Sequence, residues 1–121
     1  MPVDDCIRRQ LGLLCGRSRC RVVGSPQQGK PSDWRPEQVI APDGQPFTRV
    51  GAWEYVAQLI EQGHPIQEME LDEPKGKTGY VMEAEISKTA PVLYVKLELG
   101  SGTVIGRSFH YSYHDKRMRN D

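Results

Sequence analysis

The sequence lacks any long apolar run, and over its 121 residues the mean hydropathy is −0.60. A helix that crosses a membrane needs about 20 consecutive apolar residues, so a transmembrane helix is excluded. The first residues, Met1–Asp5, are acidic, and no apolar stretch typical of a secretory signal follows them. We therefore expect a cytoplasmic protein that does not associate with membranes.

Cysteine is scarce, with only Cys6, Cys15 and Cys20. Their odd number and their spacing fit neither a disulfide framework nor the close pairs of a zinc site, and no histidine lies near them in the sequence. We interpret Cys6 and Cys15 as core residues and predict no metal ion and no cofactor. A small thiol or metal protein that uses all three cysteines stays open as an alternative.

An excess of either charge is also missing, because 16 basic residues balance 16 acidic ones. A net charge of zero argues against broad, non-specific binding to nucleic acid. The charges are nevertheless segregated: basic residues dominate positions 8–35, and acidic residues dominate positions 36–73. This segregation permits a basic face, although a solvated surface of uneven composition explains it equally well.

What is present is typical of a globular chain, with 37% hydrophobic and 26% charged residues. A chain of this length can bury one core. We predict a single domain over residues 1–121, with a loop or arm at 24–36 and a polar tail at 112–121. Trp34 lies within that loop, and we expect it to pack onto the body of the fold because large aromatic side chains are mostly buried.

Two segments have the apolar spacing of helices. The first is Cys6–Leu14, which follows two aspartates and precedes Gly16. The second begins after Thr48, a good N-cap residue, and runs to Gln62. An Asp-Gly turn at positions 43–44 precedes the second helix.

Four later segments alternate in the period of two that strands have. They are Ile66–Leu71, Gly79–Ile86, Leu93–Leu99 and Thr103–Tyr111. Helices followed by a series of strands predict an α+β fold, in which N-terminal helices pack on one face of a mostly antiparallel sheet of three to five strands. The other face of the sheet should be open.

The last two strands are joined by a Gly-Ser-Gly loop at positions 100–102. If this loop pairs Leu99 with Thr103, Tyr94 lies opposite Ser108 on the open face. A phenol and a hydroxyl would then lie side by side on that face.

The same register brings further polar groups to this place. His110 becomes the diagonal neighbour of Tyr94, and Lys96 lies opposite Gly106, whose small size leaves room for a substrate. Arg107 falls on the covered face, and a bulge near Gly106 would turn it to the open face. An imidazole with a pKa near 6.5 acts as a base or an acid at neutral pH, so this grouping suits acid–base chemistry.

These strands carry a family resemblance. The sequence "GYVMEAEI…VLYVKLELGSGTVIGRSFH" resembles the MqsR-type members of the RelE-like ribonuclease toxins. In that family, helices precede an antiparallel sheet, and the proteins are metal-independent endoribonucleases that cleave messenger RNA and are silenced by an antitoxin protein. Tyr94 matches the tyrosine of the penultimate strand. His110 occupies the position after Ser-Phe where the family has lysine, and Lys77 is a looser match on an earlier strand.

The resemblance implies a toxin-type endoribonuclease that cleaves single-stranded or messenger RNA, with RNA and an antitoxin as partners. The residues expected to be catalytic are His110, Tyr94, Lys96 and Arg107, and those expected to bind RNA are Lys77, Tyr80, Ser108, Tyr111 and His114. The alternative is a non-catalytic interaction module, such as an antitoxin, immunity or adaptor protein, that binds a protein or nucleic acid through the open sheet face.

Overall fold

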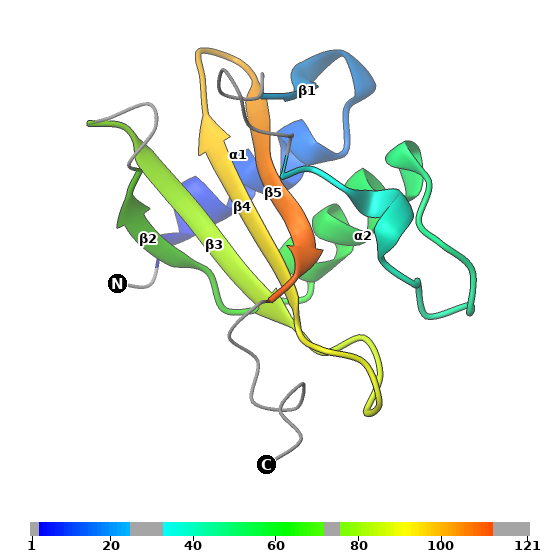
Figure 1. The fold of residues 1–121 in the computed structure, drawn as a ribbon. Coiled ribbons are helices and arrows are strands. Elements are labelled where there is room, and N and C mark those ends of the chain that lie inside the picture. Colours follow the sequence, from blue (N-terminus) through cyan, green and yellow to red (C-terminus); the bar gives the residue numbers. More distant parts are fainter. Residues whose placement is uncertain (1–2, 25–32, 72–75, 113–121) are drawn as a thin grey trace.

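The computed structural model describes residues 3–24, 33–71 and 76–112, and Figure 1 shows a sheet with two helices on one of its faces. The elements are α1 (Asp5–Cys15), η1 (Ser18–Cys20), β1 (Arg21–Val23), η2 (Pro36–Gln38), α2 (Arg49–Glu61), β2 (Gln67–Glu70), β3 (Thr78–Ala84), β4 (Leu93–Leu99) and β5 (Val104–Tyr111). The strand order is β1-β5-β4-β3-β2. Of the four pairs between these strands, β1–β5 is parallel and the other three are antiparallel. The predicted α+β fold class is confirmed.

Both helices begin at a residue whose side chain caps them, and Thr48 was predicted as such a cap. The Asp4 carboxylate accepts a hydrogen bond from the Ile7 amide at 2.8 Å, and the Thr48 hydroxyl accepts one from the Gly51 amide at 2.9 Å. Each bond satisfies an N–H group that has no partner within its helix. The helix α1 ends at Gly16, also as predicted.

The core lies between the two helices and the covered face of the sheet. Gly12 of α1 lies close to Ile60 of α2, since a Cβ atom at position 12 would be only 3.2 Å from the Ile60 side chain. Trp34 fills the centre, with its ring 4.6 Å from that of Trp53 and 5.3 Å from that of Phe109. The prediction that Trp34 packs onto the body of the fold is confirmed.

The parallel strand β1 was not expected from the sequence. It has three residues, Arg21–Val23, which pair with the start of β5, and it forms one edge of the sheet. The Arg21 guanidinium donates a hydrogen bond to the carbonyl oxygen of Cys15 at 2.8 Å, and this bond ties the edge strand to the end of α1. A strand of three residues has too little alternation to be recognised by its period.

Within the described parts of the chain, none of the helices combines the length and the apolar character that a membrane crossing requires. Most of the predicted arm (positions 25–32) and most of the predicted tail (positions 113–121) lie outside the described residues. The prediction that His114 binds RNA falls on these residues.

Candidate functional site

The register of the β4–β5 hairpin decides which side chains share the open face, the sheet face away from the helices. Leu99 pairs with Val104, so the predicted pairing with Thr103 is wrong by one residue. The register then shifts between Lys96 and Leu97. A shift of one residue exchanges the two faces of a strand. The second shift therefore cancels the first, and the residues of β5 after the shift lie on the faces that the sequence predicted.

The shift is a β-bulge at Arg107. Gly106 and Ser108 pair with neighbouring residues of β4, so Arg107 between them is the extra residue. As a result Arg107 reaches Glu98, a residue of the open face, and does not lie on the covered face. This bulge is the alternative that the sequence left open.

Gly106 does not leave room for a substrate. It pairs with Leu97 and faces the core, where a Cβ atom would lie 2.7 Å from the ring of Trp34. The expectation that Gly106 lies on the open face is wrong, because the register before the bulge differs by one residue. Its small size instead accommodates the indole ring.

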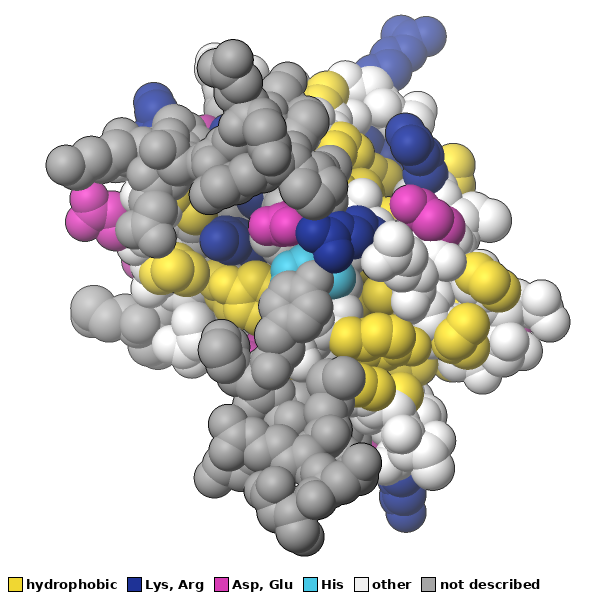
Figure 2. All heavy atoms as spheres, viewed as in Figure 1, with side chains coloured by type: hydrophobic (Ala, Val, Ile, Leu, Met, Phe, Trp, Pro, Cys, Tyr) yellow, Lys and Arg dark blue, Asp and Glu magenta, His cyan; other side chains and the backbone are white. Residues whose placement is uncertain are grey.

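Tyr94, Lys96 and His110, which we call the tyrosine–histidine cluster, lie together on the open face. Tyr94 pairs directly with His110, and their rings stack with centroids 5.5 Å apart and planes 23° apart. The Lys96 ammonium lies 6.0 Å from the centre of the Tyr94 ring. The predicted co-location of these three side chains is confirmed, but the predicted pairing of Tyr94 with Ser108 is wrong, since Ser108 pairs with Lys96. Figure 2 views this face, and the histidine visible there borders on charged and on hydrophobic side chains.

The imidazole of His110 is held by the main chain. Its Nδ1 atom lies 2.7 Å from the carbonyl oxygen of Tyr111. A carbonyl oxygen only accepts hydrogen bonds, so Nδ1 carries the donated proton, and the lone pair of the neutral ring is on Nε2. This tautomer leaves Nε2 as the basic atom of the cluster.

The Tyr94 phenol stays protonated over a wide pH range. Burial raises its pKa above the usual 10.0, and the carboxylates of Glu83 and Asp33 raise the pKa further. Glu83 is the cross-strand partner of Tyr94 on β3, which explains its influence. At neutral pH the hydroxyl is therefore a proton donor, and the sequence reasoning missed both carboxylates beside it.

Asp33 reaches the cluster because its segment extends the sheet. The Asp33 carbonyl accepts a hydrogen bond from the Phe109 amide, and the Arg35 amide donates one to the Phe109 carbonyl, both at 2.9 Å. Trp34 points to the core, so its two neighbours point to the open face. There, Arg35 and Asp33 form an ion pair at 3.1 Å. The only sequence feature that hinted at this segment was Trp34.

No protein-family model, no curated protein and no solved structure matches the chain.

Arg107 and Glu98 form a further ion pair on the open face. Both Nε and Nη2 of Arg107 donate to one oxygen of Glu98, at 2.9 and 2.6 Å. Only 8% of the Glu98 side chain is exposed. A Cβ atom at position 24 would lie 2.5 Å from the guanidinium, so Gly24 allows its approach. Because Glu98 balances its charge, Arg107 is a weaker candidate than Lys96 for binding an anion.

The structure does not bring every predicted RNA-binding residue to the cluster. Tyr80 and Tyr111 lie on the covered face and pack against the core. The Tyr111 hydroxyl accepts a hydrogen bond from the Ile40 amide at 3.0 Å. Lys77 precedes β3 and lies six positions before Glu83, the residue beside Tyr94, which is a distance of about 20 Å along a strand. Ser108, buried opposite Lys96, adjoins the cluster with its side chain, whereas Tyr111 meets His110 through its main-chain carbonyl.

The cysteines are not grouped. Cys15 is buried, as predicted, but Cys6 is exposed, so its interpretation as a core residue is wrong. It lies on the outer side of α1, away from Leu11 and Leu14. Burial raises the pKa of the Cys15 thiol to about 12, which makes it a poor nucleophile. Among the described residues, no three His, Cys, Asp or Glu side chains are placed to hold a metal ion.

The open face therefore combines a base, a proton donor and a cation within a short distance. His110 presents Nε2, Tyr94 presents a neutral hydroxyl, and Lys96 forms no ion pair within residues 3–24, 33–71 and 76–112. Such a set can move protons at a substrate and offset negative charge that develops in a transition state.

Proposed function

We propose that the protein is a metal-independent endoribonuclease that cleaves single-stranded RNA at the tyrosine–histidine cluster. The observation that carries the proposal is the stacking of His110 on Tyr94, with the Lys96 ammonium beside the same ring. Proteins read unpaired RNA by stacking and by contacts to phosphates, and both kinds of group are present here.

The cleavage step uses only the RNA and these side chains, and water is needed only to restore their protonation states. Nε2 of His110 removes the proton of a ribose 2′-hydroxyl, and the 2′-oxygen attacks the adjacent phosphorus. Lys96 stabilises the added negative charge. The Tyr94 hydroxyl gives its proton to the departing 5′-oxygen. The products are a 2′,3′-cyclic phosphate and a 5′-hydroxyl, and a second proton exchange with water restores both residues.

The proposal includes the toxin-type role that the family resemblance implies, with an antitoxin protein as partner and a RelE/MqsR-like fold. Tyr94 and His110 support it, because the residues at the two matching positions are direct cross-strand neighbours. We assign Arg107 a positioning role on the same face, since Glu98 already balances its charge.

The test is cleavage of a single-stranded RNA by purified protein in EDTA, with analysis of the product ends. Wild type should leave 2′,3′-cyclic phosphates, and His110→Ala should lose about a hundredfold or more in rate, the usual effect of removing an acid–base group. The matched control is His64→Ala, because the His64 ring binds the carbonyl oxygen of Glu83 and not the cluster. Circular dichroism should show that both variants fold.

Unchanged cleavage by folded His110→Ala would remove this residue from the chemistry. If wild type binds RNA or a protein through the open face but cleaves no RNA, the protein is an interaction module and the proposal fails.

A further inference from the structure

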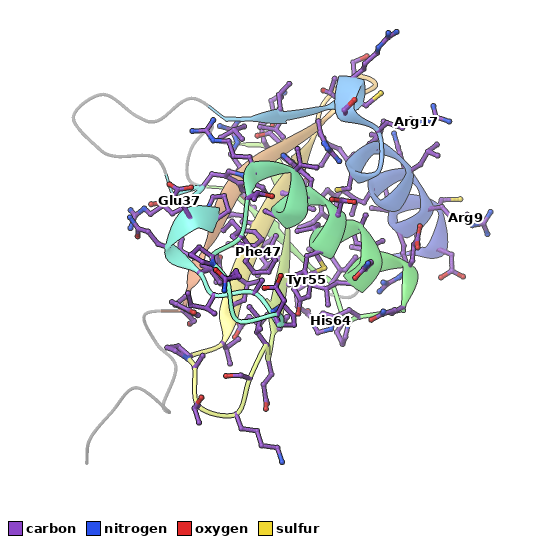
Figure 3. The ribbon with its side chains drawn as sticks, turned by 90° about the vertical axis from the view of Figure 1, so that its right-hand side faces the viewer. Arg9, Arg17, Glu37, Phe47, Tyr55 and His64 are labelled. Carbon is purple, nitrogen blue, oxygen red and sulfur yellow. The ribbon has the colours of Figure 1, made fainter. Side chains whose placement is uncertain are left out.

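The outer face of α1 carries an exposed leucine between arginines. Leu13 is 54% exposed. Arg9 lies four residues before it, on the same side of α1, and Arg17 follows the C-cap residue Gly16 just beyond the end of the helix. Arg19 follows in η1 and is also exposed. Figure 3 shows Arg9 and Arg17 projecting away from the body of the protein. We call Arg9, Leu13 and Arg17 the α1 patch.

These arginines differ from others nearby that the fold uses. Arg8 donates to the Ile60 carbonyl near the end of α2 at 3.1 Å, and Arg21 donates to the Cys15 carbonyl at the end of α1 at 2.8 Å. Within the described ranges of the chain, by contrast, no ion pair involves an arginine of the α1 patch. Their charges therefore contribute little to holding the fold together.

We propose that the α1 patch binds an acidic segment of a partner protein that presents one aliphatic side chain between carboxylates. Arginine guanidinium groups pair with carboxylates through two parallel hydrogen bonds, and Leu13 would contact the aliphatic side chain. The helix α1 has 11 residues and a length of about 16 Å, so a partner segment of two to three helical turns covers it.

The composition of the α1 patch favours a protein over RNA as the occupant. Surfaces that bind single-stranded nucleic acid combine cations with aromatic side chains on which bases stack. The α1 patch has no aromatic residue, and its centre is the aliphatic Leu13. An acidic segment with an aliphatic residue matches both of its features.

This surface is separate from the tyrosine–histidine cluster. The helix α1 belongs to the layer behind the sheet in Figure 1, whereas the cluster lies on the open face. The inference therefore does not depend on the proposed RNA cleavage, and a bound segment would leave the cluster accessible.

The test measures binding of a fluorescein-labelled helical peptide by fluorescence anisotropy. The peptide presents glutamate, leucine and glutamate at positions i, i+4 and i+8. Leu13→Ser and Arg17→Gln should each weaken its binding by about tenfold or more, as expected for central interface residues. The controls are Val50→Ser, at an aliphatic side chain that is 57% exposed on α2, and Lys88→Gln, at an exposed cation between β3 and β4. Both should bind within about twofold of wild type.

A peptide with lysines in place of the glutamates, and single-stranded poly(U) RNA, complete the test. Neither should bind in a way that depends on Leu13. The proposal is overturned if wild type does not bind the acidic peptide at up to about 1 mM, or if Leu13→Ser and Arg17→Gln bind it as wild type does. It is also overturned if the two substitutions weaken binding of RNA and not of the peptide.

Discussion

Two side chains of the open face are set in complementary states by their surroundings. The main-chain carbonyl of Tyr111 accepts a hydrogen bond from Nδ1 of His110, so the proton of the neutral ring is on Nδ1. Burial and the carboxylates of Glu83 and Asp33 keep the proton on the Tyr94 hydroxyl, because they raise its pKa. The contact of His110 is local, with the next residue of the chain, whereas the carboxylates that act on Tyr94 come from other segments.

The role of the Tyr94 hydroxyl can be tested with Tyr94→Phe, which keeps the ring and removes the acid. If the hydroxyl protonates the leaving oxygen, the rate of RNA cleavage should fall by about a hundredfold. Because the pKa of Tyr94 is raised above 10.0, the hydroxyl loses its proton only above pH 10, and the cleavage rate of wild type should decline there. The cleavage rate of Tyr94→Phe should not show this decline. The measurement is the pH profile of the cleavage rate for both proteins.

Tyr55→Phe is the matched control, since burial also raises the pKa of Tyr55, but its ring packs against Phe47 on the helix side. It should cleave RNA as wild type does. A loss of less than about threefold in Tyr94→Phe would instead make the ring a stacking surface for a base.

Among the secondary-structure elements, β5 departs most from regular geometry. Its bulge turns Arg107 to the open face, where the guanidinium meets the buried carboxylate of Glu98. The bulge also lets Gly106 face the core while Ser108 and His110 face the opposite side. One inserted residue therefore places both the ion pair and the imidazole.

Arg107→Ala should destabilise the fold, because it leaves the Glu98 carboxylate buried without its partner. We expect the free energy of unfolding to fall by about 1–3 kcal/mol, as measured by urea denaturation. The 22% exposure of the Arg107 side chain keeps the effect below that of a fully buried pair.

In the double variant Arg107→Ala/Glu98→Ala, the free energy of unfolding should fall by less than the sum of its decreases in the two single variants. The difference, the coupling energy, should be about 1 kcal/mol or more. Lys88→Ala, at an exposed cation outside any strand, should cause no measurable change. Strict additivity would show that the ion pair contributes nothing to the stability of β5.

Across the whole molecule, the helix layer, the core and the open face have separate chemical characters. Arginines and one exposed leucine cover the outer side of α1, apolar side chains fill the space between the helices and the sheet, and titratable groups gather on the open face. The net charge of zero is therefore the sum of surfaces that differ in charge.

Because the thiol of Cys15 is buried, the stability of the whole fold should decrease at alkaline pH. Its pKa is raised from 9.0 to about 12 in the folded protein, mainly by burial. Between these values the folded state retains a proton that the unfolded state loses, so the free energy of unfolding should fall as pH rises. Three pKa units correspond to a loss on the order of 4 kcal/mol, which is complete only above pH 12.

Urea denaturation at pH 8 and pH 11 should therefore show a steeper loss of stability for wild type than for Cys15→Ala. The variant lacks the thiol but retains every other group that titrates in this range. Equal losses in the two proteins would mean that the thiol ionises as easily in the folded state as in the unfolded chain.

The sequence by itself determined the elements that depend on local interactions. Thr48 caps α2 because its hydroxyl reaches an amide three residues away, and the alternation from Leu93 to Leu99 predicts the bounds of β4 correctly. The placement of Tyr94, Lys96 and His110 on one face was also predicted, since a strand displays every second residue on the same side.

Only the tertiary structure decided the pairings between distant segments. The three residues of β1 form a strand because the start of β5 pairs with them, and Asp33 reaches Tyr94 because its segment pairs with Phe109. The bulge at Arg107 followed neither from a turn residue nor from the hydrophobic period. Hydrogen bonds between strands join groups that are far apart in the sequence, so their register depends on the packing of the assembled core and not on the local order of residues.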